Sequence, residues 1–345
     1  MEERIPETPS SQETDLAQRL LAWARASHGE AAHVSAMRAL GGHSQVTVGF
    51  TLHAPGRPDE PLVLKMPPAG VAARNNFDVL RQVPLLQLLA GHGIPAPQPR
   101  HWSGDTAPFG GPFLMMSRLP GASPGDIFTE RAGAGVVDAA AQFREAARVL
   151  ARIHAIDATE VAAACTARGV TQEIDHWEQV VRRSSNAAWV ALAMRVREAL
   201  HRQQPAHVPI GLVHGDYYSN NWVFDGAALS GVVDWEGATL GPSLLDIGWL
   251  AIMYEPQSWG PLRRPHMAWH PAPRQLIDWY AQASGADLTA IDWYCALAAY
   301  RLACITAWYF ERHRSGKRRN PAWEVLGEAF EPLLAGACRR LRIAG

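Results

Sequence analysis

Residues 212–248 read LVHGDYYSNNWVFDGAALSGVVDWEGATLGPSLLDIG and carry the most chemical information in the chain. An apolar start leads to the triplet His-Gly-Asp, and Asn221 follows five residues after Asp216. Two short apolar runs on either side of a glycine turn predict a hairpin, whose second strand ends at Asp234. Such a hairpin can bring Asp216, Asn221 and Asp234 together at one end.

These three side chains suit phosphoryl transfer. Mg²⁺ prefers hard oxygen ligands, and Asp234 can supply a carboxylate while Asn221 supplies an amide carbonyl. A second carboxylate, Asp216, can stay off the metal and accept the proton of an attacking hydroxyl. The spacing from Asp216 to Asn221 matches that of the kinase catalytic loop, in which a metal-binding aspartate follows further on.

A structural interpretation competes with this chemical one. An aspartate in a turn is commonly a capping residue, so an isolated HGD or DWE triplet carries little weight. The joint spacing of the two triplets with Asn221 is much harder to obtain by chance and favours the functional interpretation. We expect His214 to scaffold its loop, because Asp216 already fills the role of base.

The first third of the chain has strand character. Alternating and β-branched residues predict an antiparallel sheet of about five strands with one helix over 76–90. The expected strands cover 33–40, 45–52, the PLVLKM run that contains Lys65, 98–103 and 112–119.

Beyond residue 119 the pattern becomes helical. An amphipathic stripe predicts a helix over 140–157, and further helices are expected over 172–203, 275–312 and 322–343. The fold class predicted is α+β with two lobes: a sheet lobe at 1–119 and a larger, mainly helical lobe at 120–345. Residues 1–14 are expected to form a frayed tail.

Two features of the sheet lobe are typical of phosphate binding. Gly42 and Ser44 lie in the GGHS turn between two strands, where backbone N–H groups can approach phosphate oxygens. Lys65 lies in an apolar strand and needs a partner that nucleotide phosphates would provide. The alternatives are a plain hairpin turn and a lysine that extends to water.

HGDYYSNN and VVDWEGATLGPSLLDIGWL resemble the catalytic loop and the metal-aspartate strand of the aminoglycoside phosphotransferase family of kinase-like enzymes. The resemblance extends more weakly over residues 30–310. It implies a protein-kinase-like fold, Mg²⁺ with ATP or GTP, a catalytic base at Asp216 and metal ligands at Asn221 and Asp234. It also implies that Asp246 is a structural acid that holds the catalytic loop.

The same resemblance assigns residues that would bind the adenine. It places Met116 in the wall of the pocket, and it gives the backbone around Ser117 to Leu119 the hydrogen bonds to the base. The chain departs from the family at Gln82, where a glutamate would hold the phosphate-binding lysine. Asp78, one turn earlier, is a candidate substitute.

The composition of the chain limits which partners and which cellular location we expect. A formal net charge of -1 gives no field directed at nucleic acid or an anionic membrane. The acidic start has no apolar signal segment, and the four cysteines have no metal-ligand spacing, so we expect a cytoplasmic protein with reduced thiols. The basic run over 312–319 is expected to be a solvated loop.

We therefore predict a kinase that acts on the hydroxyl of an unidentified small molecule. Glu236 and Glu255 are the candidate acids for a cationic acceptor, although no dense acidic run is present. One alternative is a kinase-like protein that binds nucleotide with little or no catalysis, and Gln82 motivates it. The other is a metal-dependent hydrolase, for which the sequence lacks a dense set of His and Asp ligands. Oligomeric state is not predicted.

Overall fold

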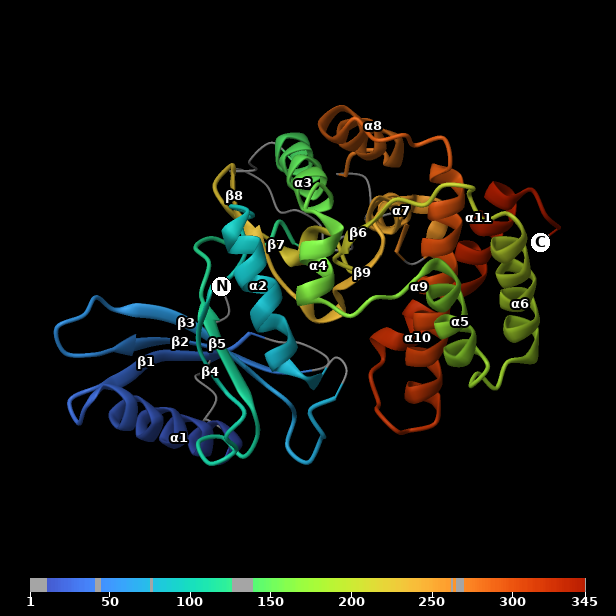
Figure 1. Cartoon of the computed structure of the whole chain (residues 1–345). Coiled ribbons are helices and arrows are strands. Elements are labelled where there is room, and N and C mark those ends of the chain that lie inside the picture. Colours follow the sequence, from blue (N-terminus) through green and yellow to red (C-terminus); the bar gives the residue numbers. More distant parts are fainter. Residues whose placement is uncertain are drawn as a thin grey trace, which may run out of the picture. The chain divides into compact units, whose positions relative to one another are not determined.

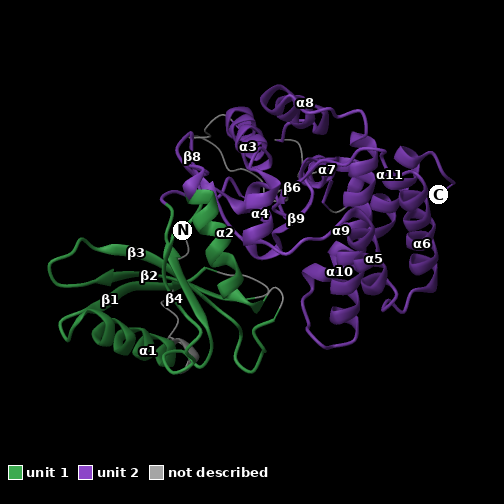
Figure 2. Ribbon diagram, in the orientation of Figure 1, with its two compact units in different colours: residues 1–90, 96–119 green, residues 91–95, 120–345 purple. Residues whose placement is uncertain are grey.

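The chain folds into two compact units, seen in the computed structural model (Figure 2). Unit 1 comprises residues 1–90 and 96–119, and unit 2 comprises residues 91–95 and 120–345. The structure describes residues 11–40, 45–74, 77–125, 139–261, 263–264 and 270–344.

Unit 1 contains the predicted five-stranded antiparallel sheet (Figure 1). Its strands are β1 (His33–Ala39), β2 (Val46–His53), β3 (Glu60–Met66), β4 (Pro99–Ser103) and β5 (Phe113–Ser117). The spatial order is β1-β2-β3-β5-β4, and each neighbouring pair is antiparallel. The sheet therefore places β3 and β5, which carry Lys65 and Met116, side by side.

One face of this sheet is covered by helix α1 (Ser11–His28). Leu20 and Trp23 of α1 share a buried cluster with Phe50 of β2 and Leu64 of β3. The helix starts at Ser11, so residues 11–14, which we expected in a frayed tail, are helical.

The single helix expected over 76–90 is two elements. A 3₁₀ turn, η2 (Val79–Arg81), precedes helix α2 (Gln82–Gly91). The Asp78 carboxylate accepts a hydrogen bond from the Leu80 N–H at 3.1 Å and so caps η2. Pro84 has no N–H and is tolerated only in the first helical turn, which explains why the α-helix begins at Gln82.

Unit 2 is mainly helical, as predicted. Its helices are α3 (Ala139–His154), α4 (Ala158–Ala164), α5 (Val170–Val181), α6 (Ala187–Arg202), α7 (Leu244–Met253), α8 (Pro273–Ser284), α9 (Ile291–Arg314), α10 (Ala322–Gly327) and α11 (Phe330–Leu341). The apolar stripe predicted on α3 is confirmed, since Phe143, Ala147, Leu150 and Ile153 are fully buried. The helix expected over 275–312 is interrupted between α8 and α9.

Two short antiparallel ladders complete unit 2. Strand β6 (Ile210–Val213) pairs with β9 (Thr239–Pro242), and β7 (Trp222–Asp225) pairs with β8 (Ala228–Val232). The β7–β8 pair is the predicted hairpin, although β8 ends at Val232 and not at Asp234. Sequence periodicity did not predict β6 and β9 as partners, because the ladder joins segments far apart in the chain.

Helices α7 and α9 approach each other closely at Gly248. A Cβ atom on Gly248 would lie 2.7 Å from the carbonyl carbon and oxygen of Tyr294 in α9. The missing side chain therefore lets the backbones of α7, which carries Asp246, and α9, which carries Arg301, lie in contact. None of the helices in the described parts of the chain is long and apolar enough to span a membrane.

We expect Gly248→Ala to lower the free energy of unfolding by about 1–3 kcal/mol, because the new methyl group meets backbone that cannot move aside. Gly336→Ala in α11 is the matched control, since its Cβ would meet only side-chain ends, Arg340 Nη1 at 3.2 Å and Arg339 Nη2 at 3.7 Å. Better helix propensity should make the control neutral or stabilising by up to about 1 kcal/mol. Urea unfolding measures both changes, and equal effects would contradict the close-contact argument.

Candidate functional site

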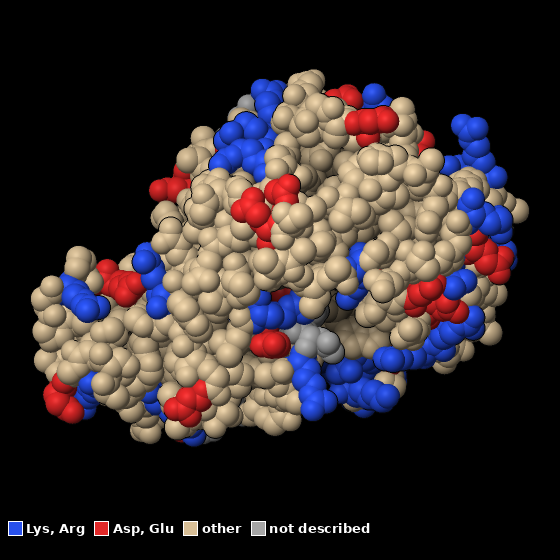
Figure 3. Space-filling view, viewed as in Figure 1, with Lys and Arg blue, Asp and Glu red and all other residues tan. Residues whose placement is uncertain are grey.

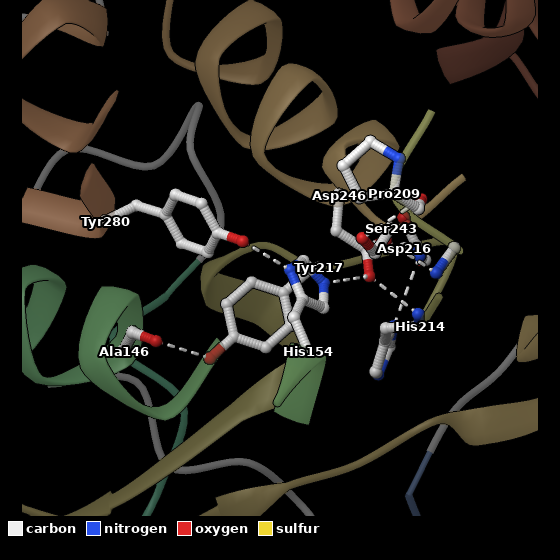
Figure 4. Close-up of polar contacts among 10 residues, drawn as sticks. Ala146, His154, Pro209, His214, Asp216, Tyr217, Ser243, Asp246 and Tyr280 are labelled. Atoms are coloured by element: carbon white, nitrogen blue, oxygen red, sulfur yellow. Dashed lines mark hydrogen bonds and ion pairs between the residues drawn. The ribbon is translucent and has the colours of Figure 1, made fainter. Parts of the chain in front are cut away.

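The loop that follows β6 is fixed by a buried carboxylate. Asp246, fully buried on α7, accepts hydrogen bonds from the backbone N–H groups of His214 at 2.7 Å and Gly215 at 2.9 Å (Figure 4). Two bonds to one carboxylate define the direction of the backbone as it enters Asp216. This contact bears out the structural role that the resemblance implied for Asp246.

A second layer keeps Asp246 ionised. His154 Nε2 lies 3.3 Å from Asp246 Oδ2, and His154 Nδ1 lies 2.8 Å from the Tyr280 hydroxyl (Figure 4). Burial alone would raise the pKa of the Asp246 carboxyl, but the hydrogen bond and charge of His154 hold that pKa below its ordinary value. The carboxylate therefore remains a strong acceptor for the loop amides.

His214 connects the loop to the hairpin. Its Nδ1 accepts from the Asp216 N–H at 3.1 Å, so its Nε2 carries the proton and donates to the Val233 carbonyl at 2.9 Å. Complete burial lowers the pKa of this imidazole and favours the neutral form that both bonds require. These contacts confirm the scaffolding role expected for His214.

Asp216 lies beside Asn221. The Asn221 amide nitrogen donates to the Asp216 backbone carbonyl at 2.8 Å and to its carboxylate Oδ2 at 3.0 Å. Burial, and next the negative charge of Asp234, raise the pKa of the Asp216 carboxyl to about 7. The charge of Arg301 acts in the opposite direction. A carboxyl with this pKa is close to the optimum for proton transfer near neutral pH.

Asp234 is brought to the same loop by backbone bonds. The Val233 N–H donates to the Asn221 carbonyl at 2.8 Å, one residue before Asp234. Asp234 itself has a left-handed backbone, with φ 66° and ψ 54°, which is uncommon for a residue with a side chain. Strained backbone of this kind is typical of functional sites. The structure thus brings together Asp216, Asn221 and Asp234, as predicted.

Arg301 is a functional candidate that the sequence interpretation missed. Its Nη2 donates to the Gly215 carbonyl at 2.7 Å, and its Nη1 lies 3.4 Å from Glu173 Oε1 on α5. The guanidinium lies 5.1 Å from the ring centroids of both Trp177 and Trp249. Arg301 therefore holds the carbonyl of Gly215, the residue whose N–H is held by Asp246.

Glu173 supplies the counter-charge for Arg301. Burial alone would raise the pKa of its carboxyl, but the charge of Arg301 and the Trp177 indole bond at 2.7 Å hold that pKa below its ordinary value. The detectable signal was a single arginine inside the apolar run CALAAYRLACITAWYF. A buried arginine requires an acidic partner, and the sequence alone does not identify Glu173 as that partner.

Position 215 requires glycine because neighbouring atoms leave no room for a side chain. Its φ is +86°, and a Cβ atom there would lie 3.0 Å from the Gly237 carbonyl oxygen and 3.2 Å from Arg301 Nη2. Only glycine combines the left-handed backbone with enough space for both neighbours.

Unit 1 gathers two of its predicted residues on one sheet face. Leu62 and Leu64 face α1, so the alternation of side chains turns Lys65 to the opposite face. Met116 pairs with the residue two positions before Lys65 and shares that face. Lys65 and Met116 are both buried. Gly42 and Ser44 lie outside the described residues.

The segment expected to contact adenine is partly engaged within the chain. The Ser117 N–H donates to the Gln98 carbonyl at 2.8 Å, and its hydroxyl accepts from the Gln98 N–H at 2.9 Å. The Arg118 N–H donates to Pro61 at 2.9 Å. These bonds leave the backbone at Leu119 as the donor that the segment could offer.

The region around Gln82 does not supply the missing acid. Gln82 is buried, and its amide nitrogen has no hydrogen-bond partner among the residues that the structure describes. Asp78, the candidate substitute, is used in capping η2.

Glu255, one of the two acids considered for binding a cationic acceptor, already has a partner. Its carboxylate is paired with Arg340 at 2.8 Å.

Comparison with known proteins identifies relatives of several kinds. Acyl-CoA dehydrogenase family member 10 of Mus musculus is 23% identical over 293 residues, which cover 80% of this chain and 27% of the mouse protein. The chain spans between about a quarter and two fifths of the length of the acyl-CoA dehydrogenase relatives it matches.

Solved structures share the fold over nearly the whole chain. A candidate aminoglycoside phosphotransferase from Ralstonia eutropha JMP134 superposes with a TM-score of 0.74 at 21% identity, covering 94% of this chain and 98% of that one. The GDP complex of aminoglycoside 2'-phosphotransferase-IIIa gives a TM-score of 0.64 at 13% identity, covering 94% and 99%. The predicted kinase-like fold is confirmed.

The model of the phosphotransferase enzyme family matches residues 35–294, which include the catalytic loop, the hairpin and Asp246. This match and the structural neighbours confirm the resemblance to the aminoglycoside phosphotransferases. The chain belongs to the phosphotransferase enzyme family.

Proposed function

We propose that the protein transfers the γ-phosphate of ATP or GTP to a hydroxyl group of a small molecule, with Asp216 as the base and Mg²⁺ held by Asn221 and Asp234. The observation that carries this proposal is the Asp216–Asn221 contact on a loop fixed by Asp246 and Arg301. The GDP complex of a structural neighbour supports the use of a nucleotide.

The donor set fits a magnesium ion. The Asn221 amide turns its nitrogen to Asp216, which directs its carbonyl oxygen away from that carboxylate. With the Asp234 carboxylate, this gives two hard oxygen ligands, and Mg²⁺ commonly takes one or two protein ligands with the rest from phosphates and water. When bound, the ion would neutralise charge on the phosphate oxygens.

Asp216 would act on the acceptor. Its ionised carboxylate takes the proton of the acceptor hydroxyl as the new O–P bond forms, and the bond from the γ-phosphorus to the bridging oxygen breaks to release the nucleoside diphosphate. Asn221 fixes the carboxylate through Oδ2 and leaves Oδ1 to receive the proton. Positioning supplies most of the rate enhancement, so a loop fixed on two sides suits this reaction.

Unit 1 would bind the nucleotide. Lys65 is proposed to contact the α- and β-phosphates, with Gly42 and Ser44 providing further contacts to them. Met116 would contact the adenine ring. Because the Ser117 N–H is engaged by Gln98, we assign the donor to the base to Leu119.

We expect Asp216→Asn to reduce kcat by about 10²–10⁴-fold, because the amide cannot accept the proton. Nucleotide affinity should stay within about twofold, since the side chain remains the same size and lies off the metal. Asp225→Asn, an exposed carboxylate on the same hairpin, is the control. Single-turnover kinetics with a nucleotide titration measures both quantities, and near-normal turnover in Asp216→Asn would disprove the assigned base.

Asp234→Ala should act on metal binding. Loss of one carboxylate ligand is expected to raise the Mg²⁺ concentration needed for half-maximal nucleotide binding by about tenfold or more. Thermal shift with ATP at increasing Mg²⁺ measures the change, because a ligand stabilises only the state that it binds. An unchanged Mg²⁺ requirement would remove Asp234 from the site.

The charge of Arg301 predicts a pH effect. Asp216 is a base only when ionised, so activity is lost as the pH falls through its pKa. The Arg301 charge lowers that pKa, so Arg301→Gln should move the acidic limb of kcat/KM to higher pH. Arg301→Lys keeps the charge and should leave the limb in place. Glu173→Gln combined with Arg301→Gln avoids an unpaired buried acid and should still show the shift.

A binding protein with little catalysis is the second candidate, and the buried Gln82 in place of a glutamate favours it. Gln82→Glu discriminates the two functions. If a carboxylate at this position orients Lys65 toward the nucleotide phosphates, the variant should gain turnover while nucleotide affinity changes little. A wild-type protein that is stabilised by Mg-ATP, yet phosphorylates no alcohol in a broad panel, would establish the binding function.

A further inference from the structure

The basic run over 312–319 is not uniformly solvated, contrary to our expectation. Arg314 is exposed and its Nε donates to Glu324 at 2.8 Å. Arg312 is half-buried with its guanidinium 4.8 Å from the Trp308 ring centroid. Among the described residues no carboxylate lies at ion-pair distance from Arg312, and its buried Nε has no hydrogen-bond partner.

Arg312 lies on the helix face that serves the catalytic loop. Trp308 and Arg312 follow Arg301 by seven and eleven residues on α9. At 3.6 residues per turn, both lie within about 20° of the direction of Arg301. Arg301 reaches the loop at Gly215, so the same face continues from the base at Asp216 toward Arg312.

An aromatic surface extends from this face to α10. Tyr309 packs against Trp308 at 4.9 Å and against Trp323 at 4.6 Å between ring centroids. The Arg318 guanidinium lies 5.3 Å from the centroid of the Trp323 ring, and the backbone N–H of Arg318 donates to the Arg312 carbonyl at 3.0 Å. We call Trp308, Tyr309, Arg312, Arg318 and Trp323 the arginine–aromatic surface. Basic side chains gather over this part of unit 2 in Figure 3.

The arginine–aromatic surface lies within electrostatic reach of the base. Burial, and then the negative charges of Asp216 and Glu236, raise the pKa of Tyr309, while Arg318 lowers it. The charge of Asp216 thus acts on Tyr309, and the face of α9 that carries Arg301 connects the loop with this surface.

A half-buried guanidinium without a counter-ion is costly, and a bound anion would offset that cost. The planar fork of arginine matches a carboxylate or phosphate with two parallel hydrogen bonds. We propose that Arg312, with Arg318 beside it, binds an anionic group on the acceptor, whose apolar segment lies on Trp308 and Tyr309. The inference rests on the proposed function and deepens it by naming the substrate class.

The position of Arg312 also limits the length of the acceptor. Eleven residues of α-helix span about 16 Å, and an arginine side chain leans toward the helix N-terminus, which shortens the distance to the loop. The anion and the reacting hydroxyl are therefore separated by on the order of 10–16 Å. The substrate class is an alcohol with a distant carboxylate or phosphate, and not a polycationic antibiotic.

The test uses the full chain with Mg-ATP and ω-hydroxy carboxylates of increasing length. Their neutral methyl esters, the monophosphates of matched diols and a polycationic aminoglycoside complete the panel. We expect the longer anionic alcohols to be phosphorylated in preference to the esters, and the carboxylate and phosphate series show which anion is selected. Arg312→Gln should raise KM for anionic acceptors at least tenfold with kcat little changed, and should leave KM for esters unaltered.

Arg314→Gln, two residues away and paired with Glu324, is the matched control and should keep wild-type KM. Arg312→Lys retains the charge and should recover part of the affinity. Calorimetric binding of an anionic alcohol without nucleotide provides a readout that does not need turnover. Turnover of esters or the aminoglycoside at least equal to that of the anions, with Arg312→Gln unchanged, overturns this inference and leaves the kinase function standing. Absence of any phosphorylated product, with anion binding unaffected by Arg312→Gln, overturns both.

Discussion

The hydrogen bonds from the His214 and Gly215 amides to the Asp246 carboxylate are the constraint on which the rest of the site depends. They join the loop after β6 to α7, an element that follows it by some thirty residues. Because the acceptor is buried and ionised, it binds both amides more strongly than a neutral acceptor would, and this fixes the loop at His214 and Gly215. His214 then transmits this order to the hairpin through Val233, which brings Asp234 close to Asp216.

The charged residues around Asp216 have opposite effects on its protonation. Burial and Asp234 favour the protonated form of Asp216, while Arg301 favours the ionised form. A cation bound at Asp234 would remove most of the repulsion between the two carboxylates and so shift the balance toward ionisation. Loading of the metal and readiness of the base are thus coupled through a single acidic neighbour.

Much of this could be predicted from the sequence, because local patterns carry it. The spacing of Asp216, Asn221 and Asp234 predicted the cluster, and strand periodicity predicted the five-stranded sheet. Contacts between distant segments could not be predicted. The β6–β9 ladder, the Glu173–Arg301 pair and the approach at Gly248 each join residues whose proximity depends on the completed fold. Arg312 and Arg314 also cannot be distinguished in the sequence. In the structure Arg314 is paired with Glu324, whereas Arg312 lies over the ring of Trp308.

Helix α9, at 24 residues, is long enough to perform separate tasks at different points. Its middle turns carry Arg301 and are packed against α7, so substitutions there disturb the reaction centre. Its last turns are only partly covered and carry Trp308 and Arg312. Substitutions in the last turns of α9 could therefore change which acceptor molecule binds during evolution. The residues proposed to carry out phosphoryl transfer would stay unchanged.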